Sequence, residues 1–149
     1  LTRLVGSEMC IRDSQKYRQF GWASARLDDF LNWIPARLTW LLLSVAALIH
    51  PRCSGTSAFK VGWDYHDGVA SPNAGWCEAT AAGALQVRLC GPIWREGELT
   101  SEHWLGPAHY RQGGTVQDIR QTAELTLIAT ALFASAGLVL LQNPFLPVG

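Results

Sequence analysis

Residues 125–141 read LTLIATALFASAGLVLL, a run of 17 residues without a charged side chain. Nine of them are Leu, Ile, Val or Phe. At roughly −0.3 to −0.6 kcal/mol each, these nine contribute about −3 to −5 kcal/mol toward insertion of a helix into a bilayer. Thr126, Thr130 and Ala134 recur at helical spacing and form an edge of small residues on which another helix can pack in lipid. The run predicts a membrane-spanning helix, with a buried helix of a soluble protein as the alternative.

The start of this helix is marked upstream of the apolar run. Thr115 and Asp118 have the spacing of a capping box, with Asp in place of the usual Glu. We therefore expect a helix from this box to about Gln142.

A second apolar run, LTWLLLSVAALI, covers residues 38–49 and predicts a helix from about Pro35 to Ile49. It is short for a membrane span, which needs about 20 apolar residues. Before it, residues 21–34 carry one apolar stripe at helical spacing, with charged residues on another side. Proline ends or kinks a helix but is also favoured in a first turn, so Pro35 can end one helix or begin the next.

The middle of the chain is more polar. Residues 50–72 are rich in Gly, Ser and Asp and predict a loop. Ser71-Pro72-Asn73 is a helix-start signal, so a helix from about Ala74 to Leu89 should follow. Residues 91–114 predict a second loop. The expected fold is all-α, a membrane-associated bundle of about four helices, one or two of them membrane-embedded, with long polar loops.

Composition narrows the class of protein. The charges balance at 12 basic and 12 acidic residues, which excludes the basic excess that a nucleic-acid backbone requires. Only 16% of the residues are charged and seven are Trp, a combination typical of membrane proteins. No two of the four cysteines have C-x-x-C spacing, and His50-x-x-Cys53 offers only two metal ligands. We therefore expect reduced thiols and no metal site.

Three clusters are candidates for chemistry. The first lies beside an apolar helix, where ionisable groups are costly unless paired or hydrated, so it indicates either function or interfacial ion pairs. Within it, the i, i+4 spacing puts Asp28 and Asn32 on one face. The second surrounds the start of a helix, where free N–H groups favour an anion, although ordinary capping is the alternative. The third is the loop at residues 91–106, with tryptophans and glycines that can shape a ligand surface or anchor at a membrane interface. The first two clusters are Arg26, Asp28, Asp29, Asn32 and Arg37, and Ser71, Asn73 and Glu78.

The order of several strings is more specific than any single cluster. FGWASARLDDFLNWIPARLT at residues 20–39 is followed by SPNAGWCEATAAGALQVRLCGP at residues 71–92, then by WLG, DIR and the apolar helix. This order resembles the CobD/CbiB family of cobalamin-biosynthesis proteins, from about Gln15 to about Leu141. The resemblance implies a multi-pass protein of the bacterial inner membrane. It also implies an enzyme that uses ATP and Mg²⁺ to join aminopropanol, or its phosphate, to adenosylcobyric acid through an amide bond.

The resemblance also implies catalytic and substrate-binding residues. Two arginines in the first string could neutralise phosphate or carboxylate charge by forked hydrogen bonds. Asp28 or Asp29 could help to hold a Mg²⁺–nucleotide complex, and Glu78 is a candidate base for the incoming ammonium. The predicted catalytic residues are thus Asp28, Asp29 and Glu78, and the predicted substrate-binding residues are Arg26, Asn32, Arg37, Ser71 and Asn73.

Two departures from the family pattern matter. Cys77 stands where the family usually has Pro, which should alter only a first helical turn. The Arg/His-rich run that usually precedes the second string is replaced by DYHDGVA, with a single His66 set further back. This replacement puts in doubt any substrate contact carried by that run.

The expected boundary lies near residue 15. SEMCIRDS, within residues 1–14, resembles translated sequencing-library adapter, so we treat residues 1–14 as non-native or disordered, with a native linker as the alternative. Residues 15–149 are then the C-terminal part of a CobD/CbiB-like membrane domain. The competing functional hypothesis is a non-catalytic membrane interaction or sensor protein of the AmpE type, which would lack the two combined strings.

Overall fold

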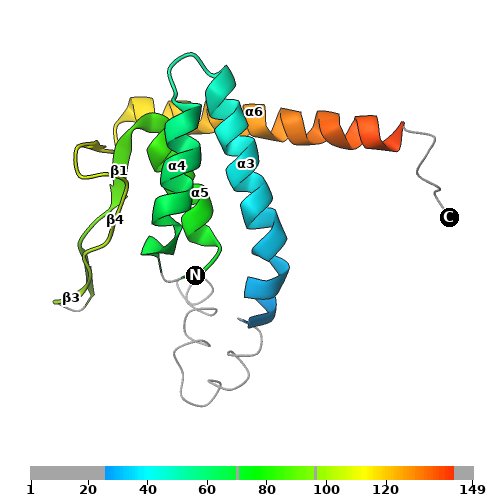
Figure 1. Cartoon of the computed structure of the whole chain (residues 1–149). Helices are drawn as coiled ribbons and strands as arrows, with labels where there is room; N and C mark the ends of the chain where they lie inside the picture. Colours follow the sequence, from blue (N-terminus) through cyan, green and yellow to red (C-terminus); the bar gives the residue numbers. More distant parts are fainter. Residues whose placement is uncertain (1–25, 70, 96, 143–149) are drawn as a thin grey trace, which may run out of the picture.

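The computed structural model describes residues 26–69, 71–95 and 97–142. Residues 26–31 are helical, and the longer helices are α3 (Trp33–Ile49), α4 (Gly55–Tyr65), α5 (Ala74–Leu85) and α6 (Val116–Leu141), with a short 3-10 helix η1 (His66–Gly68). In Figure 1, α3, α4 and α5 stand side by side, while α6 runs across one end of them and continues well past α3. The expected helical bundle is therefore present in the described part of the chain.

The all-α expectation is wrong between α5 and α6. The short strands there are β1 (Val87–Cys90), β2 (Ile93–Arg95), β3 (Glu98–Ser101), β4 (Trp104–Leu105) and β5 (Arg111–Gln112). Strand β1 pairs antiparallel with β4 and parallel with β5, whereas β2 and β3 form a separate hairpin. The predicted helix to Leu89 ends at Leu85 because Gln86 adopts a left-handed conformation, with φ of 53° and ψ of 47°, and Val87 is then buried in a strand.

The predicted loop at residues 50–72 is also wrong, because it contains α4. Ser54 caps this helix by accepting a hydrogen bond from the backbone N–H of Ser57 at 3.4 Å. The buried face of α4 consists of Gly55, Ala58, Val61 and Gly62, which gives little hydrophobic signal in the sequence. These small residues instead let α4 pack closely on α3 and α5, so tertiary contact decides the helix.

The break expected near Pro35 falls at Asn32. A helix continuing through this point would need an N–H from Pro35 to the carbonyl of Leu31, and the proline ring clashes with that carbonyl. The regular helix is therefore interrupted at Asn32, although the Asn32 carbonyl still accepts from the N–H of Ala36 at 3.0 Å. Pro35 lies in the first turn of α3, one of the two positions that the sequence allowed.

The core between the helices is built mainly from alanine. The largest buried cluster joins α3, α4, α5 and α6 through Ala46, Ala47, Ala58, Ala84, Leu125 and Ala129. A Cβ added at Gly62, in α4, would lie 2.5 Å from the Thr80 hydroxyl and 2.5 Å from Cδ1 of Trp40. The helices are thus close enough at this point that even a methyl group cannot be added without movement.

Replacing Gly62 with alanine should therefore destabilise the bundle by about 1–3 kcal/mol, the usual cost of overpacking. The loss would be measured as a lower thermal unfolding midpoint in detergent. Gly137→Ala is the matched control, because a Cβ at Gly137 would meet no atom within 4 Å. The control should leave the midpoint unchanged or slightly raised, since alanine favours a helix. Equal midpoints for the two variants would contradict the close packing.

The start of α6 confirms the capping box. Asp118 accepts from the backbone N–H of Thr115 at 2.9 Å, and Thr115 accepts from the N–H of Asp118 at 3.2 Å. Asp118 also accepts from the N–H of Gly114 at 3.1 Å and from Nη1 of Arg111 at 3.0 Å, and its second oxygen pairs with Nη2 of Arg111. One buried carboxylate therefore joins β5, the connecting turn and α6.

Asp118→Ala should cost about 2–3 kcal/mol, because it removes a charged acceptor as well as a cap. Thr115→Ala, which removes only the capping hydroxyl, should cost about 1 kcal/mol. Thermal unfolding midpoints of the two variants would rank these effects. If Thr115→Ala lowered the unfolding midpoint more than Asp118→Ala, the ion pair between Arg111 and Asp118 would not contribute to stability.

Helix α6 is long and apolar enough to cross a membrane by length and composition, and most of its surface is exposed. Helix α3 is apolar but has only 17 residues. Among the described residues, α6 alone meets the length requirement. The sequence predicts one or two membrane-embedded helices, and α6 has the length and composition of one of them.

Candidate functional site

The first two predicted clusters meet at Asn73. Its side-chain oxygen accepts a hydrogen bond from Nη1 of Arg37 at 2.8 Å, and its side-chain nitrogen donates to the backbone carbonyl of Asp29 at 2.8 Å. Asn73 is buried, although it lies in the connection that enters α5. A single amide thus links two segments that are 36 and 44 residues apart in the chain.

Arg37 is held in place from several sides. Besides Asn73, the same Nη1 donates to the carbonyl of Trp33 at 3.0 Å. The guanidinium carbon lies 4.7 Å from the centre of the Trp33 ring and 4.9 Å from that of Trp76. Both distances allow cation–π attraction. Within the described residues, no hydrogen bond is found for Nη2 or Nε, so these groups are in position to meet an anion.

An aromatic cluster lies beneath this arginine. Trp76 is only 4% exposed, and its ring packs against Trp40 at 5.1 Å and Trp63 at 5.8 Å between centroids. The His66 ring lies 4.0 Å from Trp76. Nδ1 of His66 is 2.7 Å from the carbonyl of Trp63, to which it donates, and Nε2 is 3.1 Å from the carboxylate of Asp67. A second basic side chain therefore touches the same indole as Arg37.

His66 was missed as a site residue by sequence reasoning. It stands outside the position where the family's basic run would fall, and no local pattern indicates that it packs on Trp76. His66 follows the end of α4, and η1 packs against α5, with Gly75 so close to the backbone carbonyl of His66 that no Cβ would fit. The structure thus places a histidine beside the second string.

Ser71 acts as a turn residue at the entrance to α5. Its hydroxyl accepts from the backbone N–H groups of Asn73 and Ala74, both at 3.4 Å. Asn73 makes no side-chain cap, and its amide is therefore available for Arg37 and Asp29. Ser71 therefore stabilises the turn that leads into α5, and a direct substrate contact by Ser71 stays a prediction.

The remaining residues of the first cluster surround the turn before α3. Asn32 donates to the Asp28 carboxylate at 2.8 Å, which confirms that these two residues share a face. Both are exposed, Asp29 is half-buried and Arg26 is exposed. The carboxylates thus lie close in the chain to the Arg37 site, and their catalytic roles stay predictions.

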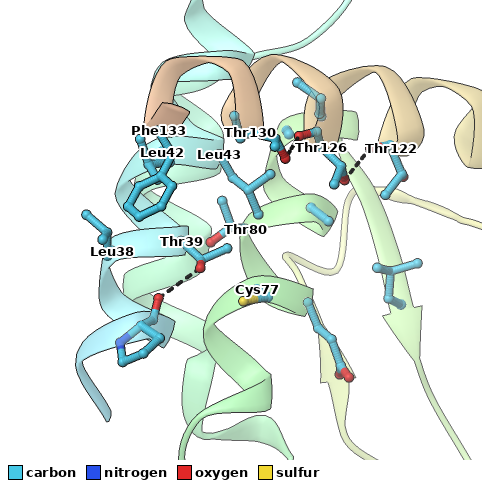
Figure 2. Close-up of a pocket in the computed structure, with 17 residues that line it drawn as sticks. Leu38, Thr39, Leu42, Leu43, Cys77, Thr80, Thr122, Thr126, Thr130 and Phe133 are labelled. Atoms are coloured by element: carbon cyan, nitrogen blue, oxygen red, sulfur yellow. Dashed lines mark hydrogen bonds between the residues drawn. The ribbon is translucent and has the colours of Figure 1, made fainter. Parts of the chain in front are cut away.

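Glu78 is directed to a different place. It lines a cavity of about 630 Å³ between α3, α5 and α6, together with Thr39 and Cys77 (Figure 2). The Cys90 thiol donates to its carboxylate at 3.8 Å. Burial and the nearby Glu78 charge raise the pKa of both the Cys77 and the Cys90 thiol. Glu78 therefore does not join Asn73, although the sequence placed the two in one cluster.

His50, one of the two possible metal ligands at positions 50 and 53, pairs with an acidic residue of α6 in the structure. Nε2 of His50 lies 2.9 Å from the carboxylate of Glu124, and Nδ1 accepts from the N–H of Arg52 at 3.3 Å. The pair fixes the end of α3 to α6. No group of three or more His, Cys, Asp or Glu side chains suited to a metal ion is found in the described parts of the chain.

The third cluster is divided between two structures. Trp104, in β4, lies under the guanidinium of Arg88 at 4.3 Å. Trp94, in the β2–β3 hairpin, is exposed. Among the described contacts of Arg37, none is made by Trp94 or Trp104, so a ligand surface in this loop stays a prediction.

Comparison with known proteins identifies the class. Residues 9–126 match the family model described as CobD/Cbib protein. The match includes both strings and begins before the predicted boundary at residue 15, which lies outside the described residues. Because the match covers more than half of the chain, the chain belongs to the CobD/CbiB family.

Individual relatives agree with this assignment. The chain is 47% identical over 118 residues to the cobalamin biosynthesis protein CobD of Citrobacter koseri, and 44% identical over 118 residues to the cobalamin biosynthesis protein CbiB of Salmonella typhi. Each match covers 79% of this chain and 36% of the relative. The chain therefore spans about a third of the length of these curated relatives. No solved structure matches it.

Proposed function

We propose that this chain forms part of a cobalamin-biosynthesis enzyme that joins aminopropanol, or its phosphate, to adenosylcobyric acid. Family membership supports the pathway, and the Arg37–Asn73–Asp29 contact supports the location of the site. That contact carries the proposal because it brings together the two strings on which the family resemblance depends. Packing alone does not account for an arginine held near two indoles whose Nη2 and Nε have no hydrogen-bond partner among the described residues.

The chemistry explains why such an arginine is needed. Condensing a carboxylate with an ammonium group releases water, so one carboxylate oxygen must be converted into a better leaving group. ATP, when bound, would supply this activation by transferring a phosphoryl or adenylyl group to that oxygen, which would leave with the transferred group as the C–N bond forms. Each stage carries negative charge on oxygen, and Arg37 stabilises it through Nη2 and Nε.

The carboxylates near the start of α3 are better suited to bind Mg²⁺ together with a nucleotide than to bind Mg²⁺ alone. Mg²⁺ is usually held by one or two carboxylates together with substrate phosphates, rather than by a complete cage of protein ligands. Asp28 and Asp29 provide two hard oxygen donors at the turn before α3, and Asp28 is exposed. We assign these two residues to the Mg²⁺–nucleotide complex, with Arg26 and Asn32 beside them.

Glu78 is assigned as the base from the cavity side. Five residues along a helix turn a side chain through about 140° relative to Asn73, which agrees with its different surroundings. For Glu78 to take the proton that the amine loses, the amine must reach the activated carboxylate from the cavity side of α5. His66, with its ring on Trp76, supports the anionic side of the site.

The membrane arrangement is part of the same proposal. Residues 125–141 of α6 cross the bilayer, and α3 lies in the protein interior of a multi-pass protein of the bacterial inner membrane. The absence of charge along this segment supports a span, and its exposed apolar surface is suited to lipid. The corrinoid and the amine are the other partners, and no nucleic acid is involved.

Complementation tests the proposal. Because the relatives are longer, this chain would replace the matched 118 residues within the Citrobacter koseri protein, and the hybrid would be expressed in a strain lacking its own family member. The hybrid should restore cobinamide formation. A hybrid that inserts into the membrane without restoring it would favour the non-catalytic sensor hypothesis instead.

A further inference from the structure

An exposed indole lies at the end of the bundle that holds Arg37. Trp40 and Trp76 are buried there, and Nε1 of Trp40 donates to the carbonyl of Phe59 at 3.2 Å, so these two rings belong to the core. Trp63 follows Phe59 by one helical turn in α4. It packs on both buried indoles, with 5.7 and 5.8 Å between ring centres, yet it is 56% exposed. Part of a large aromatic ring therefore faces outward, supported from beneath by two others.

The proposed membrane span does not account for this exposed ring. Trp63 lies near the end of α4 and Trp76 near the start of α5, whereas α6 runs across the opposite end of the three helices (Figure 1). The ion pair of α3 with α6 is made by His50, at the other end of α3 from Arg37. The exposed indole is thus at the end of the bundle away from α6, so contact of α6 with lipid does not explain it.

The exposed ring is close to the guanidinium of Arg37. The guanidinium carbon lies 4.9 Å from the centre of the Trp76 ring, and that centre lies 5.8 Å from the centre of the Trp63 ring. The Trp63 ring is therefore no farther from the guanidinium than these two steps together. Nη2 and Nε of Arg37 have no hydrogen-bond partner among the described residues. A stacking surface and an anion-binding group can thus be reached by one small molecule.

The combination selects a class of ligand. Indole faces attract flat aromatic rings, and a nucleic-acid base of any kind stacks favourably on them. A guanidinium binds phosphate through paired hydrogen bonds. A nucleotide carries both partners, since one ribose separates its base from its phosphates. A free phosphate or an acidic peptide would use the arginine and leave the indole without a partner.

We propose that Trp63 stacks on the base of a nucleotide whose phosphates are bound by Arg37. The phosphates then lie near Asp29, because Asn73 joins the Asp29 carbonyl to Arg37 through two hydrogen bonds of 2.8 Å. This inference rests on the function proposed above, in which the nucleotide is ATP, and it adds the position of the base. The adenosyl group of the corrinoid also carries adenine, but it has no phosphate to place on Arg37.

Equilibrium binding to the hybrid with the Citrobacter koseri protein, purified in detergent, tests the proposal. The probes are ATP and inorganic triphosphate, both with Mg²⁺. Trp63→Ala should raise the Kd of ATP about 10-fold, within the range for a base stacked on an aromatic ring. The Kd of triphosphate should not change, because the phosphates do not use the ring. Trp63→Phe keeps an aromatic face and should recover most of the ATP affinity, whereas Trp63→Leu should behave as the alanine variant.

Trp94→Ala is the matched control, because Trp94 is 65% exposed in the β2–β3 hairpin and is not among the described contacts of Arg37. It should change neither Kd. An unchanged Kd of ATP in Trp63→Ala and Trp63→Leu would overturn the proposal, as would a hybrid that does not bind ATP. An equal loss of triphosphate affinity in these variants would overturn it too, because the ring would then only support the arginine.

Adenosylcobyric acid is the third probe, because it carries the other adenine. If Trp63→Ala weakened its binding and not that of ATP, the ring would hold the corrinoid and the nucleotide assignment would be wrong. Binding requires no amine and no turnover, so it is separate from the test of the reaction. A hybrid that binds ATP through Trp63 but makes no product would contradict the proposed reaction and support this site. A hybrid that makes product with an ATP affinity independent of Trp63 would contradict the site alone.

Discussion

Replacing Arg37 with alanine should lower cobinamide formation by the complementing hybrid at least about 100-fold, or roughly 3 kcal/mol of transition-state stabilisation. The side chain donates to Asn73 and to the Trp33 carbonyl, and its guanidinium lies within 5 Å of the centres of two indole rings. Nη2 and Nε, for which the described residues offer no hydrogen-bond partner, can therefore meet an anion without further loss of side-chain freedom. Alanine removes both the charge and the pre-organised geometry.

Two further variants separate charge from geometry. Arg37→Lys keeps the charge but loses the fork, so it should recover only a small part of the activity. Arg52→Ala, at an exposed position where the contact with His50 is made by the backbone, should behave as the unchanged protein. Product would be measured by chromatography, with the amount of membrane-inserted protein determined for each variant. If Arg37→Ala kept half of the activity at equal protein level, the site would be wrongly located.

Introducing two arginines into α6, as Ala131→Arg with Ala136→Arg, should prevent membrane insertion of this segment. Each arginine near the centre of a span costs about 2.5–3.5 kcal/mol, so the pair costs about 5–7 kcal/mol. The apolar residues of the segment contribute only about −3 to −5 kcal/mol. Both alanines are exposed, so the change does not disturb the buried cluster between the helices.

For this measurement, α6 would be fused to a reporter protein. Insertion is the fraction of the fusion protein that stays in the membrane after extraction with alkaline carbonate. The matched control, Ala131→Leu with Ala136→Leu, alters the same positions without adding charge and should remain inserted. Continued resistance of the arginine variant would show that residues 125–141 do not cross the bilayer.

Local spacing predicted part of the fold and failed elsewhere for a physical reason. The Thr115–Asp118 box and the Asp28–Asn32 pair depend on neighbouring residues, and both are present. Helix α4 and strand β1 depend on partners far along the chain. The buried face of α4 is made of residues too small to give a hydrophobic pattern, and β1 needs β4 and β5 to pair with.

The candidate site shows the same division. The family resemblance selected Arg37 and Asn73, but only the packing of α3 against α5 brings their side chains to 2.8 Å. His66 reaches Trp76 because the end of α4 and η1 pack against α5. Glu78, although five residues from Asn73, is turned toward the cavity. The sequence thus grouped Asn73 with Glu78, which lie on different faces of α5, and it did not group His66 with Trp76, which are in contact.

The most direct measurement is amide formation by the complementing hybrid in purified membranes. Adenosylcobyric acid, aminopropanol phosphate, Mg²⁺ and ATP would be supplied, and the product identified by mass spectrometry, with aminopropanol tested in parallel. We predict product whose formation requires ATP and is lost with Arg37→Ala. Inserted hybrid that gives no product with either amine, while the intact Citrobacter koseri protein does, would contradict the proposed function.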